Sequence, residues 1–324
     1  MWFRNLQLYR LPSPWNIDAE ALQQQLSRRA FQPCGSQDQE SRGWVSPCGD
    51  DRLVHRVGDQ WLIALGFEQR LLPASVVKQE AEERAELIAA DQGYKPGRKQ
   101  MKELREQILQ EFLPRAFTRR RKVYAWIDPV GGWLGIDAPS QTRAEDVLGA
   151  LRDSLDALPL ALLRTERSPA SAMADWLAGG EAPVGFSIDL DCELRSITES
   201  KAVVRYVNHV LDGEEIRGHL AAGKMPTRLA LTFDDRISFV LTEKLEIKRL
   251  GFLDVVKEKV EDSGAEDAQA MFDASFALMT GELARLLPEL MDALGGELEA
   301  EKPSNEGALA TSDSSTTPPW EVAV

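Results

Sequence analysis

The segment from residue 74 to residue 112 constrains the fold most, because it predicts two charged helices that a compact core would not cover completely. Ala74–Ala90 reads ASVVKQEAEERAELIAA and consists largely of strong helix formers. A glycine- and proline-containing break, GYKPG, separates it from a second predicted helix, Arg98–Phe112. The apolar stripe of this helix is Met101, Leu104, Ile108 and Phe112. We expect a helical hairpin that projects as a finger, with arms on the order of 22 Å long at about 1.5 Å per residue. Lys95, Arg98 and Lys99 are expected at its apex, and residues 115–122 at its root. The alternative is that both helices pack flat on a core.

A concentrated basic run directly follows the second helix. Residues 113–122 read LPRAFTRRRK and include a single aromatic residue, Phe117. From residue 95 to residue 122 there are ten Lys and Arg and three Glu, a net charge of +7 in a chain whose formal net charge is −14. Charge segregated in this way can steer one surface toward a polyanion while the acidic remainder stays solvated. The alternative is that these cations pair with neighbouring glutamates on a solvated face.

The gross composition limits the class of protein. A length of 324 residues with 43% hydrophobic residues predicts about two domains with real cores. Three cysteines, an odd number without metal-ligand spacing, favour a reducing compartment. There is no run of about 18 apolar residues and no apolar core of a signal peptide near residue 1, so we expect a cytoplasmic protein with no membrane partner.

The residues on both sides of the predicted finger indicate an α+β fold with antiparallel sheets and packed helices. Asp18 is a candidate N-cap for a helix that runs to about Arg29, and Thr142–Glu145 has the spacing of a capping box for another helix. Gly58-Asp59 is typical of a hairpin turn. The expected strands are Trp2–Leu11, Gly43–Val45, Leu53–Val57, Trp61–Phe67, Val123–Ile127 and Trp133–Asp137.

The second half of the chain repeats this mixture of strands and helices. Five strands are expected, at Val184–Leu190, Ala202–Val207, Arg228–Phe233, Ile237–Leu241 and Leu245–Leu250. The expected helices are Met173–Leu177, Gly213–Ala222, Leu253–Glu261, Glu266–Met279 and Gly281–Leu294. We therefore predict a central α+β domain of residues 1–73 and 118–160, a finger of residues 74–117, a base α+β domain of residues 161–297, and a disordered tail of residues 298–324.

A search for a catalytic constellation finds one weak candidate. There are three histidines, His55, His209 and His219, and they do not have the spacing of a zinc site. The sequence also contains no Walker-type loop, which combines glycines with a phosphate-binding lysine. A Mg²⁺-dependent nuclease could use the carboxylates Asp189, Asp191 and Glu193, with Asp234 and Asp235. In a chain with 52 acidic residues such a cluster also arises by chance, so we predict neither catalytic residues nor a metal or other cofactor.

Nucleic-acid binding is the better supported hypothesis, because Lys and Arg contact phosphates without any sequence readout. Lys224 follows a predicted helix end and a glycine, which suits a phosphate contact, although a cation there also stabilises a helix C-terminus. The candidate DNA-binding residues are Lys78, Lys95, Arg98, Lys99, Lys102, Arg115, Arg119, Arg120, Arg121, Lys122, Lys224 and Arg228.

Six separated segments resemble the bacterial recombination-associated RdgC family. They read WFRNLQLYRL from residue 2, AFQPCGSQD from residue 30, LPRAFTR from residue 113, WIDPVGG from residue 126, HLAAGK from residue 219 and LMTGEL from residue 278. Each segment alone is weak, but together they are specific, and the resemblance extends from residue 1 to about residue 297. The chain departs from some relatives at Asn208-His209, where those relatives have Lys-Gln.

The resemblance implies a function that composition alone does not show. Members of this family are non-enzymatic, largely sequence-nonspecific DNA-binding proteins of the bacterial nucleoid. They form a ring-shaped homodimer around double-stranded DNA, with single-stranded DNA as a further ligand, and restrain RecA-driven recombination. The match around PRAF implies that Phe117 is a dimer contact. Two other hypotheses remain open, a Mg²⁺-dependent exonuclease and a factor that contacts RecA directly through its tail.

Overall fold

The computed structural model describes residues 1–12, 15–198, 201–211, 213–261, 264 and 267–298. These residues form eight α-helices and two antiparallel sheets, which confirms the α+β class. Within them, none of the helices combines the length and the apolar character that crossing a membrane requires. The predicted tail beyond Leu298 lies outside the described residues.

The first sheet has seven strands, all of which lie between residues 7 and 162. Its order is β2-β4-β5-β6-β1-β7, and β3 also pairs with β4. Val57 pairs with Gln60, so the hairpin predicted at Gly58-Asp59 is confirmed. The strands are β1 Gln7–Arg10, β2 Glu40–Val45, β3 Val54–Val57, β4 Gln60–Arg70, β5 Thr118–Asp128, β6 Trp133–Ile136 and β7 Ala161–Leu162.

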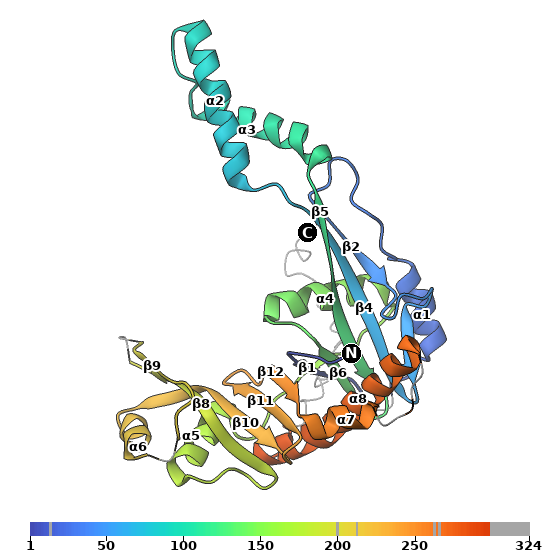
Figure 1. Cartoon of the computed structure of the whole chain (residues 1–324), viewed down its shortest axis with the longest axis vertical. Coiled ribbons are helices and arrows are strands. Elements are labelled where there is room, and N and C mark those ends of the chain that lie inside the picture. The colour runs from blue at the N-terminus through green and yellow to red at the C-terminus, as the bar shows by residue number, and fades with distance from the viewer. Residues whose placement is uncertain (13–14, 199–200, 212, 262–263, 265–266, 299–324) are drawn as a thin grey trace, which may run out of the picture.

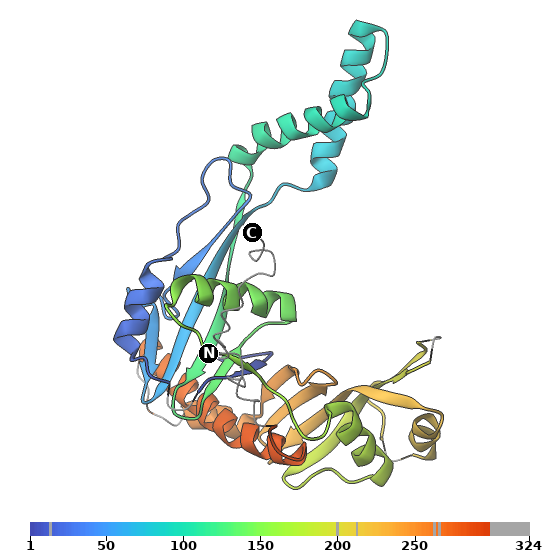
Figure 2. The ribbon, with the colours of Figure 1, turned by 180° about the vertical axis from the view of Figure 1, so that it is seen from behind.

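Helices cover both faces of this sheet. Helices α1 (Ala19–Ser27) and α4 (Gln141–Ser154) share one apolar cluster with strands β4, β5 and β6. Figure 2 shows α4 in front of the sheet and α8 behind it. Asp18 caps α1 as predicted, because its side chain accepts a hydrogen bond from the Ala21 backbone N–H. The capping box predicted at residues 142–145 is wrong, since Ser140 is the N-cap of α4.

Strand β5 is longer than its apolar pattern predicts. The predicted strand began at Val123, but pairing with β4 continues outward to Thr118, opposite Arg70. The basic residues 119–122 are therefore part of the strand and not a connection that precedes it. The hydrophobic pattern missed this extension because, beyond the covered core, both faces of a strand carry polar side chains.

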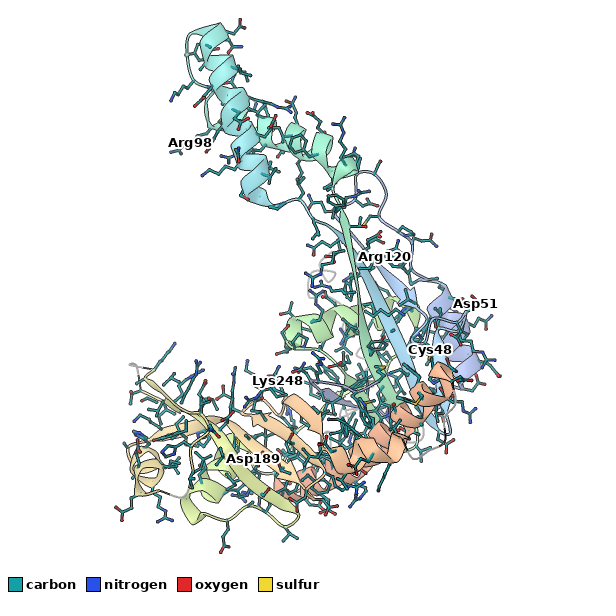
Figure 3. The ribbon with its side chains drawn as sticks, in the orientation of Figure 1. Cys48, Asp51, Arg98, Arg120, Asp189 and Lys248 are labelled. Atoms are coloured by element: carbon teal, nitrogen blue, oxygen red, sulfur yellow. The ribbon has the colours of Figure 1, made fainter. Side chains whose placement is uncertain are left out.

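Helices α2 (Ala74–Gln92) and α3 (Arg98–Phe112) lie beyond the outer ends of β4 and β5 (Figure 1). They pack against each other through a separate small cluster of Val77, Ala81, Leu104 and Ile108, which contradicts the flat packing on a core. The predicted stripe is confirmed, because Met101 and Phe112 pack against this cluster. The two helices are steeply inclined to each other, so Arg98 lies beside α2, short of its far end (Figure 3). Its expected place at the apex is wrong.

The second sheet has five strands in the order β12-β11-β10-β8-β9. They are β8 Phe186–Ser196, β9 Val203–Tyr206, β10 Lys224–Phe233, β11 Ile237–Thr242 and β12 Ile247–Phe252. Helices α5 (Pro169–Gly179) and α8 (Ala268–Ala293) pack on one face through a large apolar cluster. The connecting helices are α6 (Glu214–Ala221) and α7 (Asp254–Glu261). Two helices were predicted where α8 is continuous through Gly281, and that break is wrong.

The two sheets share a core and a backbone connection. Leu6 and Ile247 exchange two backbone hydrogen bonds of 2.8 and 3.1 Å, so the residues before β1 pair with β12. Leu62 and Trp126 of the first sheet belong to the same apolar cluster as Leu283 and Leu287 of α8. The α2–α3 pair, the seven-stranded sheet and the five-stranded sheet together form an arc, open to the left in Figure 1.

Candidate nucleic-acid interface

The basic run of β5, defined as residues 119–122, presents its cations on both faces of the strand. Side chains alternate along a strand, so Arg119 and Arg121 point to one face and Arg120 and Lys122 to the other. The Arg121 guanidinium lies 5.2 Å from the centre of the Phe67 ring. Lys122 Nζ donates to the Ser46 carbonyl at 2.7 Å. Arg119 is exposed, and the described residues supply no ion-pair partner for it.

Arg120 is the member of this run that is held most firmly. Its Nε–H donates to Glu68 Oε1 at 2.7 Å, and the Glu68 carboxylate is buried between this arginine and the Cys34 backbone N–H, 2.6 Å away. The Cys34 N–H first, and then Arg120, lower the pKa of Glu68 below its ordinary value. The solvated-face alternative therefore holds in part for Arg120, because one of its donors is already paired.

The inner edge of β5 is open next to this run. Strand β6 pairs with β5 only along Ala125–Asp128, and the Asp137 N–H donates to the Tyr124 carbonyl. In the described part of the chain no strand continues that pairing along residues 118–123. The basic run therefore lies on an unpaired strand edge, between the α2–α3 pair and the sheet core, where Figure 3 places Arg120.

The cations of the α2–α3 pair are mostly paired along their own helices. Lys78, Lys99 and Lys102 each lie within 4 Å of a glutamate four residues later, and all three pairs are exposed. Such pairs contribute only a few tenths of a kcal/mol and rearrange easily. Lys95, Arg98 and Arg115 are exposed. The pair is thus a solvated charged surface that retains cations available for phosphates.

The open face of the five-stranded sheet carries a second basic surface, which we call the base-sheet basic face. Two adjoining hollows of about 550 and 340 Å³ lie on it, and Glu193, Arg228 and Lys248 line both. The larger hollow is bounded on its other side by Pro139 and Ser140 at the start of α4. The cations of this face are Arg195, Arg205, Arg228, Lys244, Lys248 and Arg249.

Lys248 connects this face to the first sheet. Its Nζ donates to the Pro139 carbonyl at 2.8 Å and lies 3.2 Å from Glu246 Oε2. Figure 3 shows Lys248 on the side of the base sheet that faces the interior of the arc. The base-sheet basic face and the β5 run therefore border the same interior space.

Two candidate DNA-binding residues, Lys224 and Arg228, lie on β10, and only one of them belongs to the base-sheet basic face. Arg228 is exposed and belongs to the base-sheet basic face, as expected for a phosphate contact. Lys224 does not, because its Nζ is 2.7 Å from His219 Nδ1 on α6. Asn208 has a positive φ of 53°, and its backbone N–H donates to Asp191 Oδ1. Because asparagine is uncharged, this position supplies no cation.

Most of the base-sheet cations were missed from the sequence. Arg195, Arg205, Lys248 and Arg249 come from three different strands, and only Lys248 and Arg249 are consecutive in the chain. Alternation of charged and apolar residues within each strand was the available signal, but it identifies an exposed face without showing which strands adjoin.

Four of the five carboxylates considered for a nuclease each have a partner of their own. Asp189 accepts from Thr232 Oγ1 at 2.9 Å, and Asp191 pairs with Arg249 at 2.7 Å. Glu193 pairs with Arg205 at 2.6 Å, and Asp234 pairs with Arg285 at 2.6 Å. Over the described residues, no three His, Cys, Asp or Glu side chains are grouped so that they could hold a metal ion.

Phe117 lies where the α2–α3 pair joins β5. Its side chain is 84% exposed, although its backbone carbonyl accepts a 2.7 Å hydrogen bond from Leu71 N–H. The short 3₁₀ turn Leu113–Arg115 precedes it. The backbone at Phe117 is therefore fixed, while its ring is open to solvent.

Comparisons with known proteins agree along almost the whole chain. A family model described as "Putative exonuclease, RdgC" matches residues 1–297. A recombination-associated protein RdgC of Dechloromonas aromatica is 62% identical over 301 residues, covering 92% of this chain and 99% of the relative. Proteins with the same description from Janthinobacterium and Cupriavidus pinatubonensis are 50% and 51% identical, covering 92% and 93% of this chain and 99% and 100% of the relatives.

Proposed function

The chain belongs to the RdgC family, and on this basis we propose that it is a non-enzymatic, largely sequence-nonspecific protein that binds duplex DNA. The observation that carries the proposal is the placement of two basic surfaces from distant parts of the chain on one interior space. The β5 run comes from residues 119–122, and the base-sheet basic face comes from β8, β9, β10 and β12. Phosphates contacted from both surfaces would give affinity without base readout.

The proposal includes a ring-shaped homodimer, with the α2–α3 pair as its finger and residues 161–297 as its base domain. One arc borders DNA on one side, and two arcs related by two-fold symmetry would enclose it. The exposed Phe117 is the proposed contact between subunits. The domain boundaries 1–73 with 118–160, 74–117 and 161–297 belong to this proposal.

The biological role proposed is association with the nucleoid and restraint of RecA-driven strand exchange. Occupied duplex is a poorer substrate for strand exchange, so no direct contact with RecA is required. The names of the relatives link them to recombination. Direct RecA binding through the tail concerns residues outside the described part of the chain.

The first test is the salt dependence of duplex affinity, measured by anisotropy of a labelled duplex. The slope of log K against log salt should be about −0.9 per phosphate neutralised, so six to ten contacts would cost roughly 10³- to 10⁵-fold between low and physiological salt. Arg119→Ala with Arg228→Ala should weaken binding and make the slope shallower by about 2. Lys257→Ala on the outer helix α7 is the matched control and should leave both unchanged. A flat salt response would refute the proposal.

The second test addresses the dimer. Phe117→Ser should lower the sedimentation mass toward that of a monomer while the circular dichroism stays unchanged, because the ring is not part of the core. A dimer of unchanged affinity would exclude Phe117 from the subunit contact.

The second candidate function is the exonuclease named in the family description. Incubation of end-labelled duplex with Mg²⁺ or Mn²⁺, with Asp189→Ala as the control, distinguishes the two functions. Cleavage that depends on Asp189 would replace the non-enzymatic proposal.

A further inference from the structure

We propose that Glu193 is a positioning residue of the base-sheet basic face, which holds Arg195 and Arg205 in place to receive DNA phosphates. This inference rests on the proposed function. It differs from the simpler interpretation that Glu193 merely neutralises nearby arginines and opposes DNA binding.

Glu193 lies in a row of residues that crosses three strands. In the register of the sheet it is opposite Arg205 of β9 on one side and Arg228 of β10 on the other. A cation thus flanks the carboxylate on each neighbouring strand, at about the 4.8 Å spacing of strands. Arg195, two residues along β8, points to the same face of the sheet.

The carboxylate of Glu193 is buried and both of its oxygens are used. Arg205 Nε–H donates to Oε2 at 2.6 Å. Thr227 Oγ1–H donates to Oε1 at 2.8 Å, and Arg195 Nη2 lies 3.4 Å from the same oxygen. Burial alone would raise the pKa of Glu193, but the hydrogen bonds from Arg205 and Thr227 outweigh it and lower that pKa. The Glu193 carboxylate is therefore ionised near neutral pH.

The cations above it remain open to solvent. The Glu193 side chain is 5% exposed, whereas the side chains of Arg195 and Arg205 are 47% and 67% exposed. A guanidinium has five N–H donors, and each of these arginines directs one nitrogen to Glu193. Arg195 lines the larger of the two adjoining hollows, and Arg205 lines the smaller one. A buried anion beneath two exposed cations orders the arginines and leaves their phosphate-binding edges accessible.

The sign of one substitution separates positioning from neutralisation. Glu193→Gln removes a negative charge close to the proposed DNA surface, so simple Coulomb attraction predicts tighter binding. Positioning predicts the reverse, because Arg195 and Arg205 lose the charged acceptor that orders them. We expect duplex affinity to fall about tenfold, the size of one charge-assisted hydrogen bond. We also expect the slope of log K against log salt to become shallower by roughly 0.9 per arginine released.

Glu243→Gln is the matched control, because Glu243 borders the same hollow and is exposed. Loss of its charge should leave affinity unchanged or raise it. In the Arg195→Ala/Arg205→Ala background, Glu193→Gln should have no further effect on affinity. Equal or tighter binding by Glu193→Gln in the intact background would overturn the inference.

Two additional measurements keep the test decisive. If Glu193→Gln fails to fold, Arg205→Lys replaces it, since lysine keeps the charge but lacks the rigid guanidinium fork. Positioning predicts that Arg205→Lys weakens duplex binding, and unchanged binding would refute it. If the wild-type protein shows no salt-dependent duplex binding, the proposed function itself fails. If the wild type binds and Glu193→Gln binds more tightly, only the positioning role fails.

Discussion

The ion pair between Arg236 and Glu282 offers the sharpest test of how the base sheet is fastened to α8. Arg236 lies in the turn between β10 and β11, and its Nε–H donates to Glu282 Oε2 at 2.9 Å. A second guanidinium nitrogen pairs with the other carboxylate oxygen, so the contact is bidentate. The side chains are only 17% and 6% exposed. Arg236→Met keeps most of the apolar stem and removes the charge, which leaves a buried carboxylate without its main partner.

The size of the effect follows from burial. Removing one partner of a buried ion pair typically costs about 3–5 kcal/mol, because the remaining charge stays desolvated. Arg285 Nη1 lies 3.5 Å from Glu282 Oε2 and would compensate in part. We therefore expect the low end, about 3 kcal/mol of unfolding free energy, or roughly 6–12 °C in Tm if the sheets unfold together.

A double variant isolates the cause of this loss. Arg236→Met with Glu282→Leu removes both charges, and its unfolding free energy should return to within about 1 kcal/mol of the wild type. Urea and thermal melts followed by circular dichroism measure all three proteins. The reasoning is refuted if Arg236→Met costs less than about 1 kcal/mol, or if the double variant is no more stable than the single one.

Three further predictions concern stability. Gly281→Ala should stabilise the protein by about 1 kcal/mol in urea melts, because Gly281 is an exposed interior residue of α8 with open space at its Cβ position; a loss of stability would contradict this. Gly43→Ala should cost about 1–3 kcal/mol in the same assay, because the new Cβ would lie 2.5 Å from the Phe31 Cα atom; wild-type stability would show that the backbone yields freely. The lowered pKa of Glu68 stabilises the folded state at pH values above the ordinary carboxyl pKa, and this stabilisation is lost as the pH falls through the folded-state pKa. Thermal melts of Glu68→Gln from neutral to acid pH should therefore show a shallower loss than the wild type, and parallel curves would exclude this contribution.

Local patterns in the sequence were sufficient for several features. Helices α2 and α3 follow from helix-forming composition and the Gly-Pro break, and their bounds agree with the prediction to within two residues. The Asp18 cap and the Gly58-Asp59 hairpin were also correct. These features depend on backbone conformation and side chains within a few residues, so the sequence alone carries the physical signal.

Packing reversed some local signals. Two helices were expected, with a break between Met279 and Gly281, but α8 continues through Gly281 because Leu283, Leu286 and Leu287 are fully buried beside it. Each such burial contributes about 1.5–3 kcal/mol, more than the roughly 1 kcal/mol by which glycine disfavours a helix. Strand β5 likewise extends through the basic run because β4 supplies backbone partners there.

The candidate interface divides in the same way. The sequence by itself determined the β5 run, since its cations are consecutive and stand out in an acidic chain. Only the tertiary structure decided the base-sheet basic face, where Arg205, Glu193 and Arg228 meet across three strands. Strand register is set by long-range pairing and burial, and no short segment contains that information. Lys224 lies on the same strand as Arg228, but its side chain contacts His219 of α6 and not the base-sheet basic face.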